Sequence, residues 1–412
     1  LGSGASQSGF GRTGTVDWDT TPKTATFSAV SGDGFFCNTT SSAFTCNLPA
    51  GTAGAIVSLA DYAGTWQTNN LTVSPNGSQK IGGTNADLAL STEGQSVTFI
   101  YVDDTQGWLN VQDSTSNERA NVFITATGGT ITTSGNCKIH TFTGPGTFTV
   151  CTAATISANN IVSHVIVGGG AGGGGDTGGG GGAGGYREVK NPVNPFTASP
   201  LDGYCTPANR VTVSATAYPI VVGGGGAGAP GPGNPGSDGN VSSFGGITAA
   251  KGGFGGGPPG TSGPGGSGGG GDANAQPGGT GNTPPVSPPQ GNNGGASGPS
   301  PGGDASGGGG GAGAAGSAGG SPNFGGAGGN GVTSEINASP VTRAGGGGGK
   351  GTSNTAPGGS GGGGAAASPG TPGIGVNGTA NTGGGGGGGG MCGPRAGGAG
   401  GSGVVIIRYK FQ

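Results

Sequence analysis

The sequence predicts an all-β protein, with an antiparallel β-sandwich or jelly-roll-like module followed by a glycine-rich domain of polyglycine II helices anchored on β-strands. Short runs of alternating apolar and polar residues recur in the first third of the chain, and no window has the i, i+3, i+4 spacing of an amphipathic helix. Of 412 residues, 112 are glycine and 28 are proline. Glycine brings no side chain to bury and loses much backbone entropy on folding, so apolar burial alone cannot fold this chain.

The N-terminal part divides into an arm and a module. Residues 1–22 are polar and rich in glycine and serine, which predicts an extended arm. Residues 23–113 contain alternating runs of Val, Ile, Phe and Thr, separated by turn signals such as Asn76-Gly77 and Glu93-Gly94. This pattern is typical of a half-buried antiparallel sheet and predicts a β module.

The rest of the chain is predicted to be a connector and a glycine-rich domain. Residues 114–163 read as β strands with a hairpin, and residues 164–412 are dominated by glycine between two apolar runs, 164–167 and 404–409. A terminal strand is not stable alone, so these two runs are expected to pair and to return the glycine segments to one platform. Glycine helices with three residues per turn could then pair backbone with backbone. An entropic Gly/Ser spacer is the alternative.

The number and spacing of the cysteines suggest disulfides. A two-residue turn at Ser41-Ser42 would place Cys37 and Cys46 directly opposite each other in a hairpin, at a non-hydrogen-bonded position where a bridge can close. Cys137 and Cys151 flank a second hairpin, whose register needs a bulge. The disulfide candidates are Cys37, Cys46, Cys137, Cys151, Cys205 and Cys392. Bridges would indicate an oxidising compartment, and buried free thiols are the alternative.

Catalytic and nucleic-acid functions find little support in the residues. The formal net charge is −3 without clustered Lys or Arg, no apolar run is long enough for a membrane span, and G-x-G-x-x-G matches occur by chance at this glycine content. His140 and His164 lie inside strand patterns, far from any acidic cluster. We therefore expect no enzyme, no cofactor, no metal site, no nucleic-acid partner and no membrane insertion.

A surface-recognition loop is predicted in residues 186–210, the longest insertion without glycine runs. It mixes aromatic, charged and proline residues, as a rigid binding loop would, although its aromatic rings could instead cap the glycine region. The recognition candidates are Tyr186, Arg187, Phe196, Tyr204 and Arg210. The N-glycosylation candidates, which matter only in a secretory pathway, are Asn38, Asn70, Asn76, Asn240, Asn337 and Asn377.

Several strings carry a resemblance to phage proteins. The stretch GRTGTVDWDTTPKTATFSAVSGDGFF and the strings DYAGTW and YVDDTQGW resemble a β module of tail-fibre and other virion proteins of bacteriophages, especially those that infect marine cyanobacteria. The strings HTFTGPGTFTV, VIVGGGAGGGG and GGSGVVIIRY resemble the glycine-rich C-terminal domain of phage tail fibres and adhesins.

The resemblance implies a structural fibre subunit on a virion surface, which assembles with copies of itself and presents the glycine-rich domain to a host glycan or an outer-membrane receptor. The alternative is a subunit of an extracellular or cell-surface filament, in which residues 1–22 add as a strand to the sheet edge of a neighbour.

Overall fold

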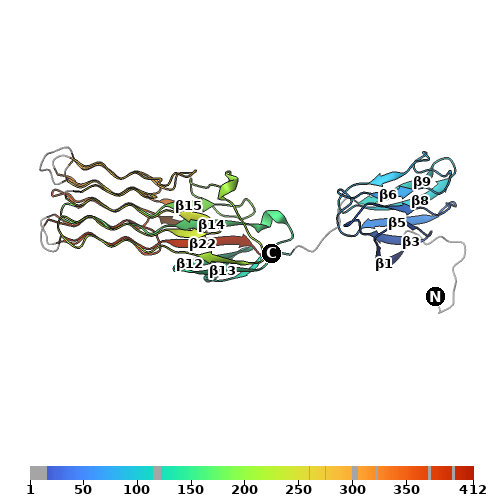
Figure 1. The fold of residues 1–412 in the computed structure, drawn as a ribbon, viewed down its shortest axis with the longest axis horizontal. Coiled ribbons are helices and arrows are strands. Elements are labelled where there is room, and N and C mark those ends of the chain that lie inside the picture. The colour runs from blue at the N-terminus through green and yellow to red at the C-terminus, as the bar shows by residue number, and fades with distance from the viewer. Residues whose placement is uncertain are drawn as a thin grey trace. The chain divides into compact units, whose positions relative to one another are not determined.

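The computed structural model describes residues 16–114, 122–258, 260–273, 275–298, 305–320, 323–369, 373–391 and 395–412. The chain forms two compact units, residues 1–120 and residues 121–412 (Figure 1). Strands dominate both, and helical structure in the described residues is limited to two short 3₁₀ turns, Ser157–Asn160 and Pro207–Asn209. The predicted all-β class is confirmed.

The N-terminal unit is a sandwich of two sheets. The strands of the first, in sheet order, are β1 (Asp17–Lys23), β3 (Asp33–Cys37), β5 (Ile56–Asp61), β8 (Ser96–Asp103) and β9 (Gly107–Ser114). Those of the second are β2 (Phe27–Ser28), β4 (Phe44–Asn47), β6 (Leu71–Ser74) and β7 (Leu88–Leu90). Successive strands from β1 to β6 alternate between the sheets, so β1, β3 and β5 pair in parallel, as do β2, β4 and β6. The predicted antiparallel arrangement is therefore wrong for the first half of the module and correct for β5, β8 and β9.

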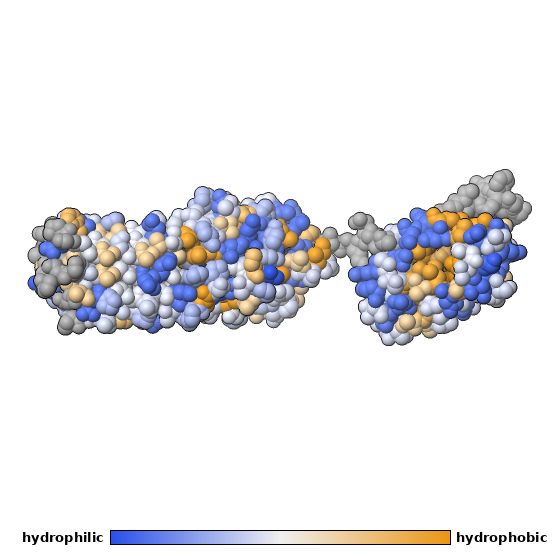
Figure 2. All heavy atoms as spheres, turned by 90° about the horizontal axis from the view of Figure 1, so that it is seen from above, coloured by the Kyte–Doolittle hydropathy of each residue, from blue (hydrophilic) through white to orange (hydrophobic). Residues whose placement is uncertain are grey.

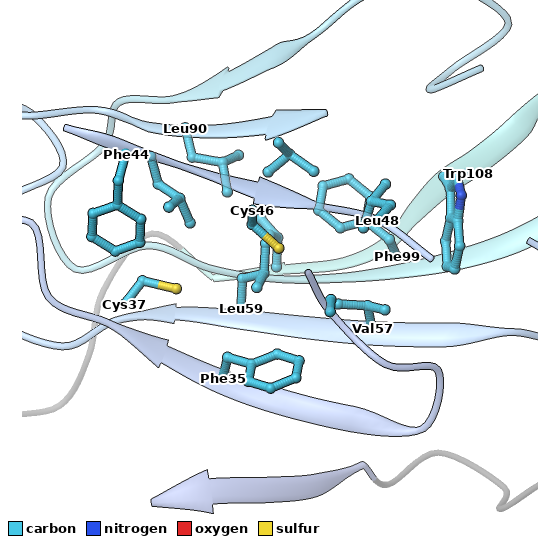
Figure 3. Close-up of a cluster of buried hydrophobic side chains, with 14 of the residues drawn as sticks. Phe35, Cys37, Phe44, Cys46, Leu48, Val57, Leu59, Leu90, Phe99 and Trp108 are labelled. Atoms are coloured by element: carbon cyan, nitrogen blue, oxygen red, sulfur yellow. The ribbon is translucent and has the colours of Figure 1, made fainter. Parts of the chain in front are cut away.

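The two sheets share one apolar core. Because side chains alternate along a strand, Phe35 and Cys37 of β3 face Phe44 and Cys46 of β4 across the sandwich interior (Figure 3). Trp108 packs in the same core and is fully buried. The period-2 pattern predicted from sequence accounts for these inward positions.

The predicted arm is shorter than residues 1–22, since residues 17–22 belong to β1. Asp17, Trp18 and Asp19 pair with β3 inside the unit, and the Trp18 ring lies 4.8 Å from the Phe36 ring. A residue at position 34 with a Cβ would clash with the Trp18 ring at 2.7 Å, which explains glycine there. Residues 1–15 lie outside the described part of the chain.

The hairpins behind the predicted disulfides do not form. β3 and β4 belong to different sheets, so Cys37 pairs with Asp61 while Cys46 pairs with Val73. The chain likewise crosses between sheets after Cys137, whose strand pairs with β11 and β22 and not with the strand that carries Cys151.

The described cysteines are free thiols in the structure: Cys37, Cys46 and Cys137 are buried, and Cys151 and Cys205 are exposed. Burial raises the pKa of Cys46 to about 12, which keeps that thiol protonated and unreactive. Cys392 lies outside the described residues.

The C-terminal unit is built on a platform of sheets. The largest contains, in order, β11 (Thr130–Ser134), β12 (Cys137–Phe142), β22 (Val404–Lys410), β14 (Ile161–Val167) and β15 (Tyr186–Val189), with β16 (Val211–Thr212) on β14. A second contains β10 (Thr125–Thr127), β13 (Gly146–Thr152) and β17 (Ala217–Ile220). Two hairpins complete it: β18 (Ser242–Phe244) with β19 (Ile247–Ala249), and β20 (Val332–Ser334) with β21 (Val341–Arg343). The predicted connector, from residue 122 to 163, is thus part of this unit.

Strand β22 lies in the middle of the platform, between β12 and β14. Val405 and Ile407 face one apolar cluster with Phe148 and Phe244, while Ile406 faces a second cluster on the other side of the sheet. The predicted pairing of the entering and closing strands is confirmed by their antiparallel register, from residues 163 and 408 to residues 167 and 404.

Between β14 and β22 the chain forms a glycine lattice, a set of extended segments that run out from the platform and back (Figure 1). Segment 168–175 shows its order. Its N–H groups donate in turn to three neighbouring segments, so that every third residue has the same partner. Residues 168, 171 and 174 donate to segment 178–185, and residues 169, 172 and 175 donate to segment 234–240. Residues 170 and 173, with the adjacent residue 176, donate to segment 395–401. This repeat of three is that of polyglycine II, with one hydrogen-bond direction per residue of the turn.

Close packing of backbones explains the glycine content. Carbonyls of segment 168–175 accept from three further segments, 223–229, 250–257 and 383–390, so its surroundings are hexagonal and entirely backbone. A Cβ on Gly170 would lie 2.1 Å from the Gly384 carbonyl oxygen, and one on Gly173 would lie 2.1 Å from that of Gly387. Backbone pairing therefore takes the place of an apolar core, and Figure 2 shows mostly near-neutral residues over this part of the surface.

His164 makes the platform sensitive to acid. This side chain is fully buried on β14, against the Phe244 ring. Neither of its ring nitrogens has a hydrogen-bond partner among the described residues. Burial, together with the nearby Arg187 charge, lowers its pKa to about 3. The unfolded chain takes up a proton on this histidine near pH 6.5, whereas the folded chain does not. The contribution of the neutral histidine to the free energy of unfolding is therefore complete above pH 6.5 and is lost as the pH falls toward 3.

We expect the C-terminal unit to lose about 2 kcal/mol through this group between pH 7.5 and pH 5, at about 1.4 kcal/mol per pH unit below 6.5. Urea unfolding of wild type and His164→Phe at both pH values measures it, because the variant lacks only this proton. An identical pH dependence in the two chains would contradict the assignment.

Candidate surface-recognition site

The predicted recognition loop is partly a structural element. Tyr186 is buried at 1% exposure on β15, and its hydroxyl donates to Glu188 Oε2 at 2.9 Å. The same carboxylate accepts from the Ser199 N–H at 3.0 Å and from Ser334 Oγ at 2.6 Å. Burial raises the pKa of Glu188 and raises that of Tyr186 well above its usual value. The Glu188 carboxylate therefore ties the loop to the β20–β21 hairpin, and the buried Tyr186 is not available to a ligand.

Two further candidates are also occupied within the fold. The Arg187 guanidinium donates from Nη2 to Asn209 Oδ1 at 2.6 Å, and its burial lowers its pKa. The half-buried Phe196 ring lies under the Arg408 guanidinium, 5.1 Å from the ring centre. Both residues brace the loop against the platform, which agrees with the capping interpretation of this segment.

Tyr204 and Arg210 remain together at the surface. The Arg210 guanidinium stacks on the Tyr204 ring at 4.3 Å, and its Nε donates to the Tyr204 carbonyl at 2.7 Å. The exposed Cys205 lies beside this pair in sequence. A stacked arginine on an aromatic ring leaves guanidinium donors and a flat apolar surface available, the combination that binds sugars and carboxylates.

Arg210 borders a surface hollow of about 570 Å³ that sequence reasoning did not predict. The residues that line it are Arg210, Val211, Thr212, Tyr218, Pro219, Ser243, Gly245, Gly246 and Thr248. Most come from β16 to β19, short strands whose sequence signals are weak. The hollow combines a cation, an aromatic ring and several hydroxyls, which suits a polar ligand such as a glycan.

A second groove of about 420 Å³ meets the first at Thr248. Its lining residues are Asp238, Val241, Thr248, Ala250, Lys251, Pro264, Gly265, Thr283, Pro284, Val286 and Gln290. They come from the β18–β19 hairpin and from the glycine segments that leave the platform beside it.

Comparison with known proteins identifies the larger part of the chain. Residues 141–410, well over half of the sequence, match the glycine-rich domain family. The chain belongs to this glycine-rich domain family. No curated protein matches the chain at the sequence level.

The match of the glycine-rich domain begins within β12 and ends at the last residue of β22. It therefore includes both strands that frame the lattice, β14 and β22, and it contains the hollow, the groove and the loop 186–210. The N-terminal unit lies outside it. The resemblance of the C-terminal part to glycine-rich domains is thereby supported.

The sequons lie at the surface of both units. Asn76, Asn240 and Asn377 are exposed, and Asn38, Asn70 and Asn337 are half-buried. In the glycine-rich domain, the Asn377 side chain accepts from the Ala399 N–H at 2.8 Å and so replaces a backbone partner in the lattice.

Other kinds of site were sought in the part of the chain that the structure describes. There, no group of three or more His, Cys, Asp or Glu side chains is placed to hold a metal ion. Within the same residues, no helix is long and apolar enough to cross a bilayer.

Proposed function

We propose that the chain is a non-enzymatic structural fibre subunit whose glycine-rich domain attaches a virion to a host surface. Membership of the glycine-rich domain family and the resemblance of both parts to phage fibre proteins support this role. The observation that carries it is the glycine lattice, in which the N–H groups of a segment bond to neighbours in three directions. The lattice is therefore a stiff support built mainly of backbone.

Attachment is assigned to the hollow beside Tyr204 and Arg210. It lies on the platform, where Tyr218 of β17 and Ser243 of β18 line it together with Arg210. The partner we propose is a surface glycan or an outer-membrane receptor of the host, recognised through hydroxyl and carboxylate groups.

The alternative of strand addition by the N-terminal arm loses part of its basis. Residues 17–22 belong to β1, whose Asp17, Trp18 and Asp19 already pair with β3 of their own sheet.

Binding to cells tests the proposed attachment. Fluorescently labelled full chain is titrated onto marine cyanobacterial cells, and saturable binding is expected. Arg210→Ala is expected to weaken binding about tenfold, as for a central arginine contact. The matched control is Lys138→Ala, which removes another cation stacked on a ring, that of Phe411 at 4.7 Å, away from the hollow. Absence of saturable binding, or equal loss in both variants, would contradict the proposed function.

A further inference from the structure

The glycine lattice has one open position, beside segment 250–257. The N–H groups of this segment point in three directions. Those of Gly252 and Gly255 donate to segment 168–175, and those of Gly253 and Gly256 donate to segment 267–272. The third row contains the N–H groups of Lys251 and Phe254, and no backbone carbonyl among the described residues accepts from either.

The direction of this third row follows from the carbonyls. The carbonyls of segment 250–257 accept from segments 178–185, 263–266 and 234–240. In a helix with three residues per turn, N–H and C=O directions alternate around the axis. The third N–H row therefore points between segments 234–240 and 263–266.

The groove of about 420 Å³ lies at this open position, because Asp238 and Val241 come from one flanking segment, Lys251 from the floor, and Pro264 and Gly265 from the other. The groove therefore borders the position that one further segment would occupy, and Thr283, Pro284, Val286 and Gln290 line another part of it.

Side chains cover part of the open row. Asp238 Oδ1 accepts from the Phe254 N–H at 3.1 Å, where a neighbouring backbone carbonyl would otherwise lie, and Asp238 Oδ2 pairs with Lys251 Nζ. The Lys251 N–H has no partner among the described residues. This ion pair is partly exposed, so the Lys251 side chain can move aside when a segment enters the groove, while Asp238 keeps its bond to the Phe254 N–H.

A segment on the opposite side of the lattice has the complementary polarity. Segment 178–185 is central, and segments 250–257 and 344–351 lie on its opposite sides. Its Gly179 and Gly182 N–H groups donate to segment 250–257. Its Gly178 and Gly181 carbonyls accept from segment 344–351. Segment 356–360 packs outside 344–351 and forms an outer edge of the lattice.

Segment 356–360 turns an unused carbonyl outward. Its Gly359 N–H donates inward to Gly346, while the carbonyls of Pro357 and Gly359 accept from its two side neighbours. Because N–H and C=O directions alternate around this segment too, the Gly358 carbonyl points away from the lattice, and no N–H group among the described residues donates to it. Its sequence, Pro357-Gly358-Gly359-Ser360, keeps glycine where backbones approach and proline and serine outside.

From this complementarity we infer that two copies of the chain associate, with segment 356–360 of one filling the open position of the other. The Gly358 carbonyl then accepts from the Lys251 N–H group, which has no partner within the described part of one copy, and the lattice continues across the contact. Because the two surfaces are different and lie on opposite sides, the contact is heterologous and can repeat along a row of copies. This association goes beyond the proposed attachment and requires no receptor.

Sedimentation velocity of the full chain at rising concentration tests it. Wild type is expected to form dimers and longer species. Lys251→Pro keeps the extended backbone but removes the N–H and fills the groove with its ring, whereas Lys251→Ala keeps the N–H. Ser360→Trp blocks the inserting edge, and Ala318→Trp places the same bulk at an exposed position of segment 314–319, an outer segment that borders neither the groove nor segment 356–360. The first variant of each pair is expected to weaken association at least tenfold, and the second to leave it unchanged.

A mixture of Lys251→Pro and Ser360→Trp provides a sharper test, since only one intact contact can form between them. It is expected to stop at dimers. Thermal unfolding confirms that each variant is folded. The inference is overturned if folded wild type remains monomeric, if Lys251→Pro or Ser360→Trp associates like wild type, or if the mixture forms long species. Cell binding is not involved, so this result is independent of the attachment test.

Discussion

Replacing Gly180 by alanine is expected to destabilise the C-terminal unit by about 3 kcal/mol or more. Gly180 lies in the central segment 178–185, and a Cβ there would sit 2.1 Å from the Gly347 carbonyl oxygen and 3.0 Å from the Gly309 nitrogen. Both obstacles are backbone atoms held by their own hydrogen bonds, so no side-chain rotation relieves the clash and the lattice must open. Urea unfolding of the full chain, followed by a probe in the C-terminal unit, measures the loss.

The matched control is Gly224→Ala, in an outer segment of the same lattice. The nearest atom to its added Cβ would be Asn240 Nδ2 at 3.7 Å, an ordinary contact. This variant is expected to stay within about 1 kcal/mol of wild type, with a small gain from the reduced entropy of the unfolded chain. Equal stability of the two variants would show that the central segment is packed more loosely than these distances require.

Deleting residues 404–412 is expected to unfold the C-terminal unit as a whole. The deletion removes β22, whose Val405, Ile406 and Ile407 are fully buried and whose backbone pairs with both β12 and β14. Each buried side chain of this size contributes about 1.5–3 kcal/mol, so the loss, with the ladder bonds added, is comparable to the whole stability of a typical domain, about 5–15 kcal/mol. Without β22 the platform is incomplete, and the glycine segments lose the strands on which they begin and end.

Hydrogen exchange with mass spectrometry distinguishes the two units. In the truncated chain, amides between residues 168 and 403 are expected to exchange as fast as those of a free peptide, while β3, β5 and β8 of the separate N-terminal unit keep their protection. In the intact chain the glycine lattice should be protected. Persistent protection of the lattice in the truncated chain would mean that its backbone bonds suffice without the platform.

Several local features could be predicted from sequence because they depend on neighbouring residues. The alternation of residues 96–101 predicts that Val97, Phe99 and Tyr101 point inward, as they do. The strand pairings could not be predicted in the same way. A two-residue turn at Ser41-Ser42 would have made a hairpin. The chain instead forms an arch between opposite sheets, in which Phe35 and Phe44 share one core and Cys37 does not meet Cys46 across a ladder.

The candidate site was located only in part. Sequence reasoning selected Tyr204 and Arg210, which are at the surface, together with Tyr186, which is buried beside Glu188. It missed Tyr218 and Ser243, because the hollow that they line is formed by short strands that carry no motif and come together only in the fold.

By itself, the sequence determined the all-β class, the strand that closes the chain, and the repeat of three in the glycine region, because each follows from side-chain size and spacing along a few residues. Only the tertiary structure decided which segments neighbour each other and where the lattice lacks one. Glycine backbones are chemically alike, so nothing local distinguishes one partner from another. The order comes from the platform strands and turns that fix where each segment starts, and those leave the N–H group of Lys251 without a backbone partner beside the groove.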